Sequence, residues 1–392
     1  MLTRRGWGLT VGALGLALAG RLLGVLELYV LAAGAWALMG TALAYLALRP
    51  ADVEGRRTLH PARVQAGDEC RVELSVANRG RRATAVIELR DRVGGGPRLA
   101  RLLLAPLAAG AEERATYRIP TEQRGVLSVG PLEARRFDPL ALATTARTIA
   151  PVTELVVYPT VEPVLALPRA PGDDRKGGSR RAAAMGSAGE DFYALRPWAV
   201  GDDLRRVHWP STARRDELMV RQHDVPWQGR ATVVLDLRAR YHDEDSVEQA
   251  VSAAASIAAA SGQGGSMVRL VLTDGSDTGF GTGPAHVDAI LDRLARAQPD
   301  EGEGDGGVLD LPTVDGAMAL IVTADVPAAE VARLARLSSS PRALTMVTLA
   351  RDGVPATTDG PSRTVLLGPG QPLAPAWNRA VAAAGGLQRL AL

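Results

Sequence analysis

The chain has 392 residues, which is long enough for two or three domains of about 100–200 residues each. Its 45 basic and 43 acidic residues leave a formal net charge of +2, which excludes a strong overall attraction for nucleic acid. The single cysteine, Cys70, excludes an internal disulfide framework and a cysteine-based zinc site.

Two apolar runs open the chain, at 7–22 with only Arg21 interrupting and at 25–48 with only Glu27 interrupting. A helix that crosses a bilayer needs about 20 apolar residues. A signal peptide would account for the first run alone, so we expect residues 1–50 to form a transmembrane helical hairpin. Small residues on both runs either allow close packing of the two helices or are ordinary lipid-facing positions: Gly12, Gly15, Ala19, Gly34, Ala37 and Thr41.

Cationic residues flank this predicted hairpin on both sides. Arg4 and Arg5 precede it, and Arg49, Arg56 and Arg57 follow it. Since positive charge collects on the cytoplasmic side, both termini and the bulk of the chain are expected in the cytoplasm. The expected location is the inner, or plasma, membrane, crossed twice.

Residues 51–167 show short runs of alternating polar and apolar residues, separated by turn residues. The clearest runs are 71–77, 85–90, 114–120, 125–130 and 154–159. Strands at this spacing predict an all-β, immunoglobulin-like sandwich, although no Cys…Trp…Cys core is present. A domain of this kind usually binds a partner or separates other domains, and nothing in its sequence indicates catalysis.

The stretch 168–188 is rich in Gly, Ala, Arg and Lys and predicts a flexible linker. Its basic residues either keep the linker solvated or contact an anionic membrane surface.

In residues 230–392, strands and helices alternate. The expected strands are 231–237, 267–273, 317–323 and 343–349, and the expected helices are 246–261, 284–297, 327–337 and 372–384. Ser246 is the expected N-cap of the first helix. This alternation predicts a doubly wound, mostly parallel α/β domain of Rossmann type.

Three aspartates follow strands of this domain, at the edge where such sheets bind ligands: Asp236, Asp274 and Asp325. Oxygen-rich clusters of this kind attract hard cations. However, Arg238 and Arg240 follow Asp236 closely, and two guanidinium groups beside a divalent cation are electrostatically unfavourable. We therefore expect no metal and no other cofactor.

The segment 189–229, called the signature segment below, concentrates charged and aromatic residues. Seven carboxylates and six arginines between Glu190 and Asp224 nearly cancel, which excludes a phosphate-binding patch. Either Arg–Asp pairs fix this segment on the α/β domain, or its tryptophans anchor a protein partner. The candidate partner-binding residues are Arg196, Trp198, Gly201, Asp202, Asp203, Arg205, Arg206, His208, Trp209 and Arg214.

His208 and Ser211 lie close enough in sequence to raise a hydrolytic alternative, with Asp202 and Asp203 nearby. No Gly-x-Ser-x-Gly elbow accompanies them. Ser211 follows Pro210 and looks instead like the N-cap of a short helix over 212–217.

The stretch Leu195-Arg-Pro-Trp-Ala-Val-Gly-Asp-Asp-Leu-Arg-Arg-Val-His-Trp209, followed by Ser211-Thr-Ala-Arg and Leu218-Met-Val-Arg, resembles the signature of the bacterial domain of unknown function 58 family. Further support comes from the two predicted spans, Asp138-Pro-Leu-Ala-Leu and Tyr158-Pro-Thr-Val.

The resemblance implies a membrane-anchored protein with a von Willebrand factor A-like domain. It also implies partnership with a MoxR-type AAA+ ATPase and association with a transglutaminase-like membrane protein. Von Willebrand A domains often bind metal through Asp-x-Ser-x-Ser, whereas this chain reads Asp236-Leu-Arg238-Ala-Arg240.

These observations favour a non-enzymatic, membrane-anchored adaptor or scaffold that partners such an ATPase in protein-complex assembly or cell-envelope maintenance. Two alternatives remain open: a divalent-cation-dependent protein-binding module of von Willebrand A type, and an uncharacterised hydrolase.

Overall fold

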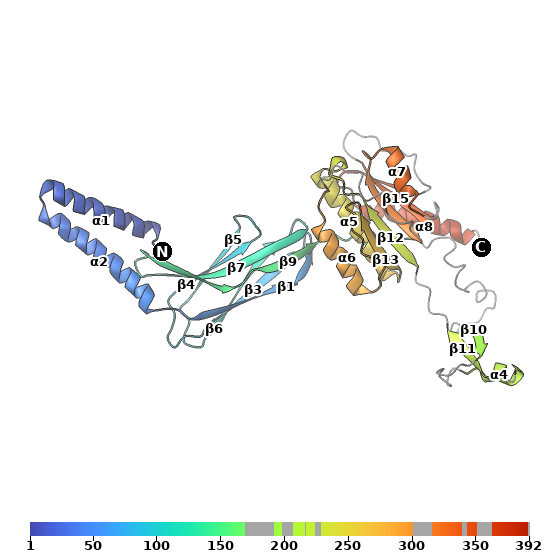
Figure 1. The fold of residues 1–392 in the computed structure, drawn as a ribbon, viewed down its shortest axis with the longest axis horizontal. Helices are drawn as coiled ribbons and strands as arrows, with labels where there is room; N and C mark the ends of the chain where they lie inside the picture. Colours follow the sequence, from blue (N-terminus) through green and yellow to red (C-terminus); the bar gives the residue numbers. More distant parts are fainter. Residues whose placement is uncertain are drawn as a thin grey trace. The chain divides into compact units, whose positions relative to one another are not determined.

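A computed structural model describes residues 1–168, 192–197, 207–215, 217–223, 229–300, 316–338, 343–350 and 363–390. The chain divides into two compact units, Met1–Tyr158 and Pro159–Leu392 (Figure 1). Each unit is described by itself. The linker predicted at 168–188 lies, apart from its first residue, outside the described residues.

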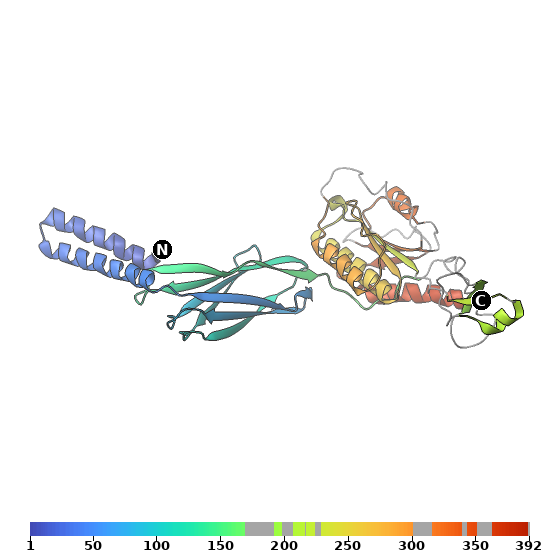
Figure 2. The same cartoon turned by 60° about the horizontal axis from the view of Figure 1, so that its bottom comes forward.

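The first unit begins with two helices, α1 (Arg4–Leu23) and α2 (Leu26–Leu48), which lie side by side as a hairpin (Figure 2). Gly24 ends α1 in the left-handed conformation, with φ 68°, which glycine adopts without a steric cost. Both helices are long and apolar enough to cross a membrane. The prediction of two N-terminal apolar helices is therefore confirmed.

Of the two interpretations of the small residues in these helices, the structure favours outward-facing positions for the glycines. A Cβ atom added at Gly12, Gly15 or Gly34 would have no neighbour within 4 Å, so these glycines face outward. Ala13 and Ala32 are buried instead. The helical period places them on the inner face, and composition alone does not reveal which small residues share that face.

The free ends of the hairpin are attached to the β-rich part of the same unit. The Thr3 hydroxyl donates to the carbonyl of Ala141 over 2.6 Å. Met39, Ala42 and Leu46 of α2 share a small apolar cluster with Leu142 and Ala143.

The β-rich part contains a three-stranded sheet and a six-stranded sheet. The first has the order β1 (Val53–His60), β3 (Glu69–Asn78), β6 (Glu112–Pro120). The second has the order β2 (Arg63–Gln65), β9 (Thr153–Tyr158), β7 (Gly125–Phe137), β4 (Ile87–Val93), β5 (Leu99–Leu104), with β8 (Thr144–Ala150) paired to β7.

Alternate side chains from both sheets enclose one core. Cys70, Val72 and Leu74 of β3 meet Leu89 of β4 and Leu155 of β9 there, and all five are fully buried. The prediction of a β-rich body between the hairpin and the α/β region is therefore confirmed, while its immunoglobulin-like type stays a prediction.

The second unit contains a five-stranded sheet in which every neighbouring pair is parallel. The strands are β12 (Arg230–Leu235), β13 (Met267–Leu272), β14 (Ala317–Thr323), β15 (Leu344–Leu349) and β16 (Thr364–Leu367), in the order β13-β12-β14-β15-β16. β14 and β15 are buried along their whole length, as expected for a parallel sheet covered on both faces.

Among the described residues of this unit, the helices that accompany the sheet are α5 (Glu244–Gln263), α6 (Pro284–Arg296), α7 (Ala328–Ala335) and α8 (Leu373–Leu390). Because the crossovers through α5 and α7 run in opposite directions along the sheet, right-handed connections place these helices on opposite faces. Ser246 is not the N-cap of α5. Asp243 caps the helix, and Ser246 completes a capping box from the third position.

Residues 159–167, expected in the sandwich domain, belong to the second unit. The backbone nitrogen of Glu162 donates to Ser256 of α5 over 2.9 Å. The carboxylate of the same residue accepts from the backbone nitrogens of Leu373 and Ala374 at the start of α8, over 2.9 and 2.8 Å. The boundary between the two units therefore lies near Tyr158.

Part of the signature segment forms a two-stranded antiparallel sheet of β10 (Phe192–Pro197) and β11 (Met219–His223). The short helix α4 (Trp209–Arg215) precedes β11. The run Leu218-Met-Val-Arg-Gln-His223 alternates between apolar and polar residues as a strand does, and β11 covers all of it except Leu218.

Candidate functional site

The strongest candidate site lies where the strand order of the parallel sheet reverses. β12 is the second strand of the sheet, with β13 on one side and β14 on the other, so the chain leaves it first toward β13 and then crosses to β14. In open α/β sheets, ligands bind at this switch point, beyond the carboxyl ends of the strands. The segment 236–241 follows β12 there and ends in the 3-10 helix η4 (Ala239–Tyr241).

Asp236, the first residue after β12, is held by the side chain of Arg238. The Arg238 guanidinium donates from Nε to Oδ1 over 2.9 Å and from Nη2 to Oδ2 over 2.6 Å. The Arg238 backbone nitrogen also donates to Oδ1, over 3.1 Å. Asp236 is completely buried, and this two-pronged pairing satisfies its charge within the chain.

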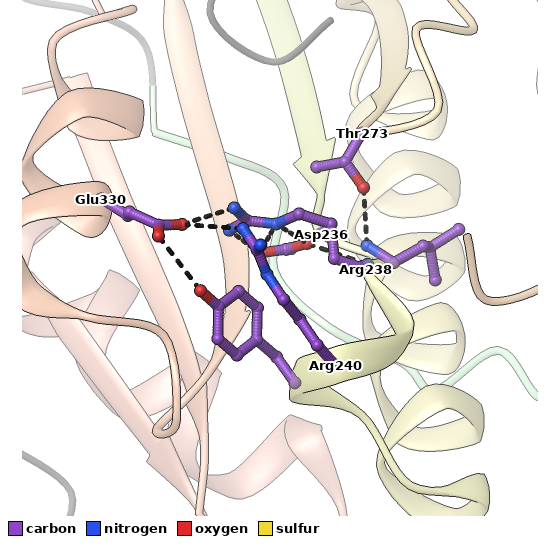
Figure 3. Close-up of polar contacts among 7 residues, drawn as sticks. Asp236, Arg238, Arg240, Thr273 and Glu330 are labelled. Carbon is purple, nitrogen blue, oxygen red and sulfur yellow. Dashed lines mark hydrogen bonds and ion pairs between the residues drawn. The ribbon is translucent and has the colours of Figure 1, made fainter. Parts of the chain in front are cut away.

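Glu330 reaches the same guanidinium from the first turn of α7, the helix that follows β14 (Figure 3). Its carboxylate accepts a close hydrogen bond from Arg238 Nη1, and a second, over 3.1 Å, from the Tyr241 hydroxyl. Arg240 approaches Glu330 more loosely, at 3.8 Å. We call Asp236, Arg238, Tyr241 and Glu330 the switch-point cluster.

Neighbouring contacts fix the position of this cluster. The hydroxyl of Thr273, the residue directly after β13, accepts a hydrogen bond from the backbone nitrogen of Leu237 over 2.8 Å. The carbon at the centre of the Arg238 guanidinium lies 4.7 Å from the centre of the Tyr241 ring, within the range of a cation–π contact. The loop after β12 is therefore held by Thr273 on the β13 side and by Glu330 of α7 on the β14 side.

The electrostatics of the cluster favour the charged forms of its members. Burial alone would lower the pKa of Arg238, but hydrogen bonds to Asp236 and Glu330 outweigh it and raise that pKa above its usual value. Burial likewise opposes the charge on Glu330, yet hydrogen bonds from Arg238 and Tyr241 hold the pKa of this carboxyl below its usual range.

A metal ion does not fit this arrangement, because the Arg238 guanidinium already occupies both oxygens of Asp236. In the part of the chain that the structure describes, no group of three His, Cys, Asp or Glu side chains could hold a metal ion. The structure does not bring the three candidate aspartates together. Asp274 bonds Ser276 and approaches Arg293, and Asp325 lies in the turn after β14.

Six of the ten candidate partner-binding residues lie outside the described residues: Trp198, Gly201, Asp202, Asp203, Arg205 and Arg206. The backbone of Arg196 lies in β10, opposite Val220. Trp209 and Arg214 lie on α4, and the Trp209 side chain is 66% exposed, as a residue that anchors a partner would be.

His208 and Ser211 do approach each other, with 2.8 Å between Nδ1 and Oγ. The helix begins at Trp209, so the expectation that Ser211 caps a helix over 212–217 is wrong. Pro210 suits the first turn and allows this earlier start. Asp202 and Asp203, the acids proposed to complete a triad, lie outside the described residues.

Sequence reasoning missed Glu330, Tyr241 and Thr273. Glu330 has a usable signal, since it is an acidic residue in the first turn of the helix after β14. Because β14 adjoins β12, that turn lies at the switch point. Recognising this requires the strand order, which the sequence pattern leaves open.

Comparison with known proteins gives one family and several distant structures. No curated protein matches the chain. Similar solved structures include a CARDB domain from Pyrococcus furiosus, which is 17% identical, covers 27% of this chain and 86% of its own, and has a TM-score of 0.21. The ApaA protein from Bordetella pertussis is 15% identical, covers 28% of this chain and 96% of its own, and has a TM-score of 0.22. Residues 194–352, which contain the switch-point cluster and most of the signature segment, match the family model described as "Protein of unknown function DUF58".

Proposed function

We propose that this chain is a membrane-anchored, non-enzymatic adaptor whose α/β unit is a von Willebrand A-like domain with an internal cation. The observation that supports this most directly is Arg238, which sits at the switch point and occupies both oxygens of Asp236. Because the chain itself neutralises Asp236, a protein-binding surface at this site would need no bound metal ion.

Wild-type protein and the double variant Arg238→Ser, Arg240→Ser test the internal cation. The variant restores the spacing Asp-x-Ser-x-Ser and frees the oxygens of Asp236. Calorimetric titration with magnesium should give no heat for the wild-type chain and measurable binding for the variant. Magnesium binding by the wild-type chain would contradict the proposal and favour a cation-dependent binding module.

The two apolar helices support the membrane anchor. Large apolar side chains on their outer surfaces, including Trp7, Leu14, Leu18, Val30 and Trp36, are exposed. Lipid would cover such surfaces without further protein. The proposed arrangement keeps both termini and both folded units in the cytoplasm.

The proposed partner is a MoxR-type AAA+ ATPase, as the family resemblance implies, with a transglutaminase-like membrane protein as a further associate. Trp209 is the residue best placed to test this, because it is exposed in the signature segment. An exposed tryptophan is a frequent anchor of protein interfaces.

Binding of the purified ATPase to the full chain in nanodiscs would test the partner. Trp209→Ala should weaken binding by about 2 kcal/mol, or roughly thirtyfold. Leu366→Ala is a matched control, because Leu366 is an exposed apolar residue of β16, outside the signature segment. Equal affinity of the wild-type chain and Trp209→Ala would contradict docking through this residue.

A second candidate, a hydrolase, is favoured by one observation, the 2.8 Å contact between His208 and Ser211. A histidine so placed could activate the serine hydroxyl. A serine-reactive fluorophosphonate should then label the wild-type chain and not Ser211→Ala. Without such labelling, the contact has only a structural role, joining the start of α4 to its first turn.

A further inference from the structure

The first unit contains a cavity of about 590 Å³ at the point where α2 gives way to β1. Its lining combines the last turn of α2 with residues at one end of the β-rich part. Tyr45, Leu48 and Arg49 come from the helix end, Arg81 and Arg82 from the loop after β3, and Arg136 from the end of β7.

The lining is strongly cationic. It contains four arginines against one carboxylate, that of Asp52, which lies 3.5 Å from Arg147 outside the lining. Within the described residues, none of the four arginines forms an ion pair with a carboxylate. A cavity with this balance of charge attracts an anion.

Arg136 is the most enclosed of the four. It donates to the backbone carbonyl of Arg49 and, over 3.3 Å, to the Thr145 hydroxyl. Burial lowers the pKa of this guanidinium, and no carboxylate of the described residues pairs with it. An anion in the cavity would supply the missing counter-charge.

The apolar side of the cavity continues onto the outer surface of α2. Leu48, in the cavity lining, is 79% exposed. The Arg49 guanidinium lies 5.2 Å from the centre of the Tyr45 ring. Tyrosine and arginine at the end of an apolar helix are typical of the membrane interface. A ligand here would meet charge on one side and an exposed apolar helix on the other.

We propose that this cavity binds the phosphate headgroup of an anionic phospholipid, such as phosphatidylglycerol, whose acyl chains lie along α2. The inference rests on the proposed membrane anchoring of the hairpin. Basic pockets beside membrane helices are known to bind anionic headgroups, and each arginine near such a surface contributes about a fivefold preference. Inorganic phosphate shares the charge but lacks the acyl chains that the apolar surface would accommodate.

The test uses the full chain in nanodiscs that contain equal amounts of phosphatidylglycerol and phosphatidylcholine. After gentle extraction into detergent, the co-purified lipid is quantified by mass spectrometry. The wild-type chain should retain phosphatidylglycerol with at least about fivefold enrichment. Arg81→Gln combined with Arg82→Gln should reduce this ratio to near one, and neither arginine forms an ion pair whose loss would disturb the described fold.

Arg79→Gln is the matched control. Arg79 lies in the same loop, pairs with Glu54 over 2.8 Å and does not line the cavity. The control should keep the wild-type enrichment. An equal loss in the control would show that overall charge, rather than the cavity, selects the lipid, and would overturn the proposal. No enrichment in the wild-type chain would overturn it as well.

Two further arms separate the possible reasons for failure. If inorganic phosphate at millimolar concentration displaces the retained phosphatidylglycerol completely, the site binds soluble phosphate and the lipid assignment is wrong. Resistance to carbonate extraction measures the membrane anchor independently. A wild-type chain that resists extraction but shows no lipid preference would refute the cavity proposal while leaving the anchor intact.

Discussion

At the scale of single residues, the β-rich part contains a buried ion pair that the core must accommodate. Arg57 of β1 pairs with Asp91 of β4, and their side chains are 1% and 0% exposed. Arg57 also donates to the carbonyls of Val129 and Pro151 over 3.0 and 2.7 Å. The Tyr117 hydroxyl donates to Asp91 over 2.7 Å, so the buried charges are well satisfied.

Asp91→Ala should destabilise the first unit by about 3–5 kcal/mol, because it leaves the Arg57 charge buried and unpaired. Tyr117→Phe, which removes one hydrogen bond, should cost about 1 kcal/mol. Cys70 provides the measurement, since it is the only cysteine and is fully buried in the same core. Maleimide labelling of Cys70 in increasing urea reports unfolding of this unit. Equal midpoints for both variants would contradict the assigned role of Arg57.

Glu330 predicts a pH dependence of the second unit. Because the pKa of Glu330 is lowered in the folded state, its contribution to stability is present above about pH 4.5, its unfolded value, and is lost as the pH falls through the folded value. Glu330→Gln should therefore lower the thermal midpoint near neutral pH and flatten the decline of that midpoint in acid. Near-UV circular dichroism of the full chain would measure both. Parallel acid curves for the wild-type chain and the variant would refute this coupling.

At the scale of elements, local pattern predicted the buried strands well and the charged or short ones poorly. β12, β13, β14 and β15 are nearly uninterrupted apolar runs, and the structure confirms each within one or two residues. β1 was not predicted because it contains Gly55 and Arg57. A charged residue usually indicates an exposed position, whereas the Arg57 side chain is buried. β16 has only four residues, too few to establish a period.

The candidate site divides in the same way. The sequence placed Asp236 at a strand end and Arg238 beside it, because both belong to one short loop. It missed Glu330, which is 92 residues away from Arg238 and reaches it through the order of the strands. A contact within one loop can be predicted from the spacing of its residues in the sequence. A contact between two crossover connections can be predicted only when the order of the strands in the sheet is known.

The hairpin offers a prediction at this scale. A Cβ atom at Gly20 would lie 3.1 Å from the Tyr29 ring, whereas one at Gly12 would have no neighbour within 4 Å. Gly20→Leu should therefore destabilise the contact between α1 and α2 by about 1–3 kcal/mol through overpacking. Gly12→Leu should have no such effect, and serves as the control on the same helix. Hydrogen exchange of α1 in detergent would measure the difference, and faster exchange in Gly12→Leu than in Gly20→Leu would contradict the assigned inner face.

At the scale of the whole molecule, the two units meet in sequence near Tyr158, nine residues before the boundary expected at 167. We predicted a longer sandwich domain because the sequence shows no linker-like stretch directly after the last strand, β9. The contacts that assign 159–167 to the second unit join residues far apart in the chain. The Trp377 indole donates to the carbonyl of Leu165 over 2.7 Å, for example, and no local pattern reveals that bond.

This boundary predicts different stabilities for two soluble fragments. A fragment of residues 159–392 retains the Glu162 carboxylate at the start of α8, the carbonyl that accepts from Trp377, and the burial of Leu167. A fragment of residues 168–392 loses all three and leaves the buried indole of Trp377 without its acceptor, which alone costs about 1–3 kcal/mol. The longer fragment should therefore be more stable and unfold at a higher midpoint concentration of urea. Tryptophan fluorescence, to which the completely buried Trp377 contributes, would measure the two midpoints. Glu162→Gln in the longer fragment should reproduce only the part of the loss that comes from the start of α8. Equal midpoints for the two fragments would mean that residues 159–167 add nothing to the second unit, and would return the boundary to the position that the sequence suggested.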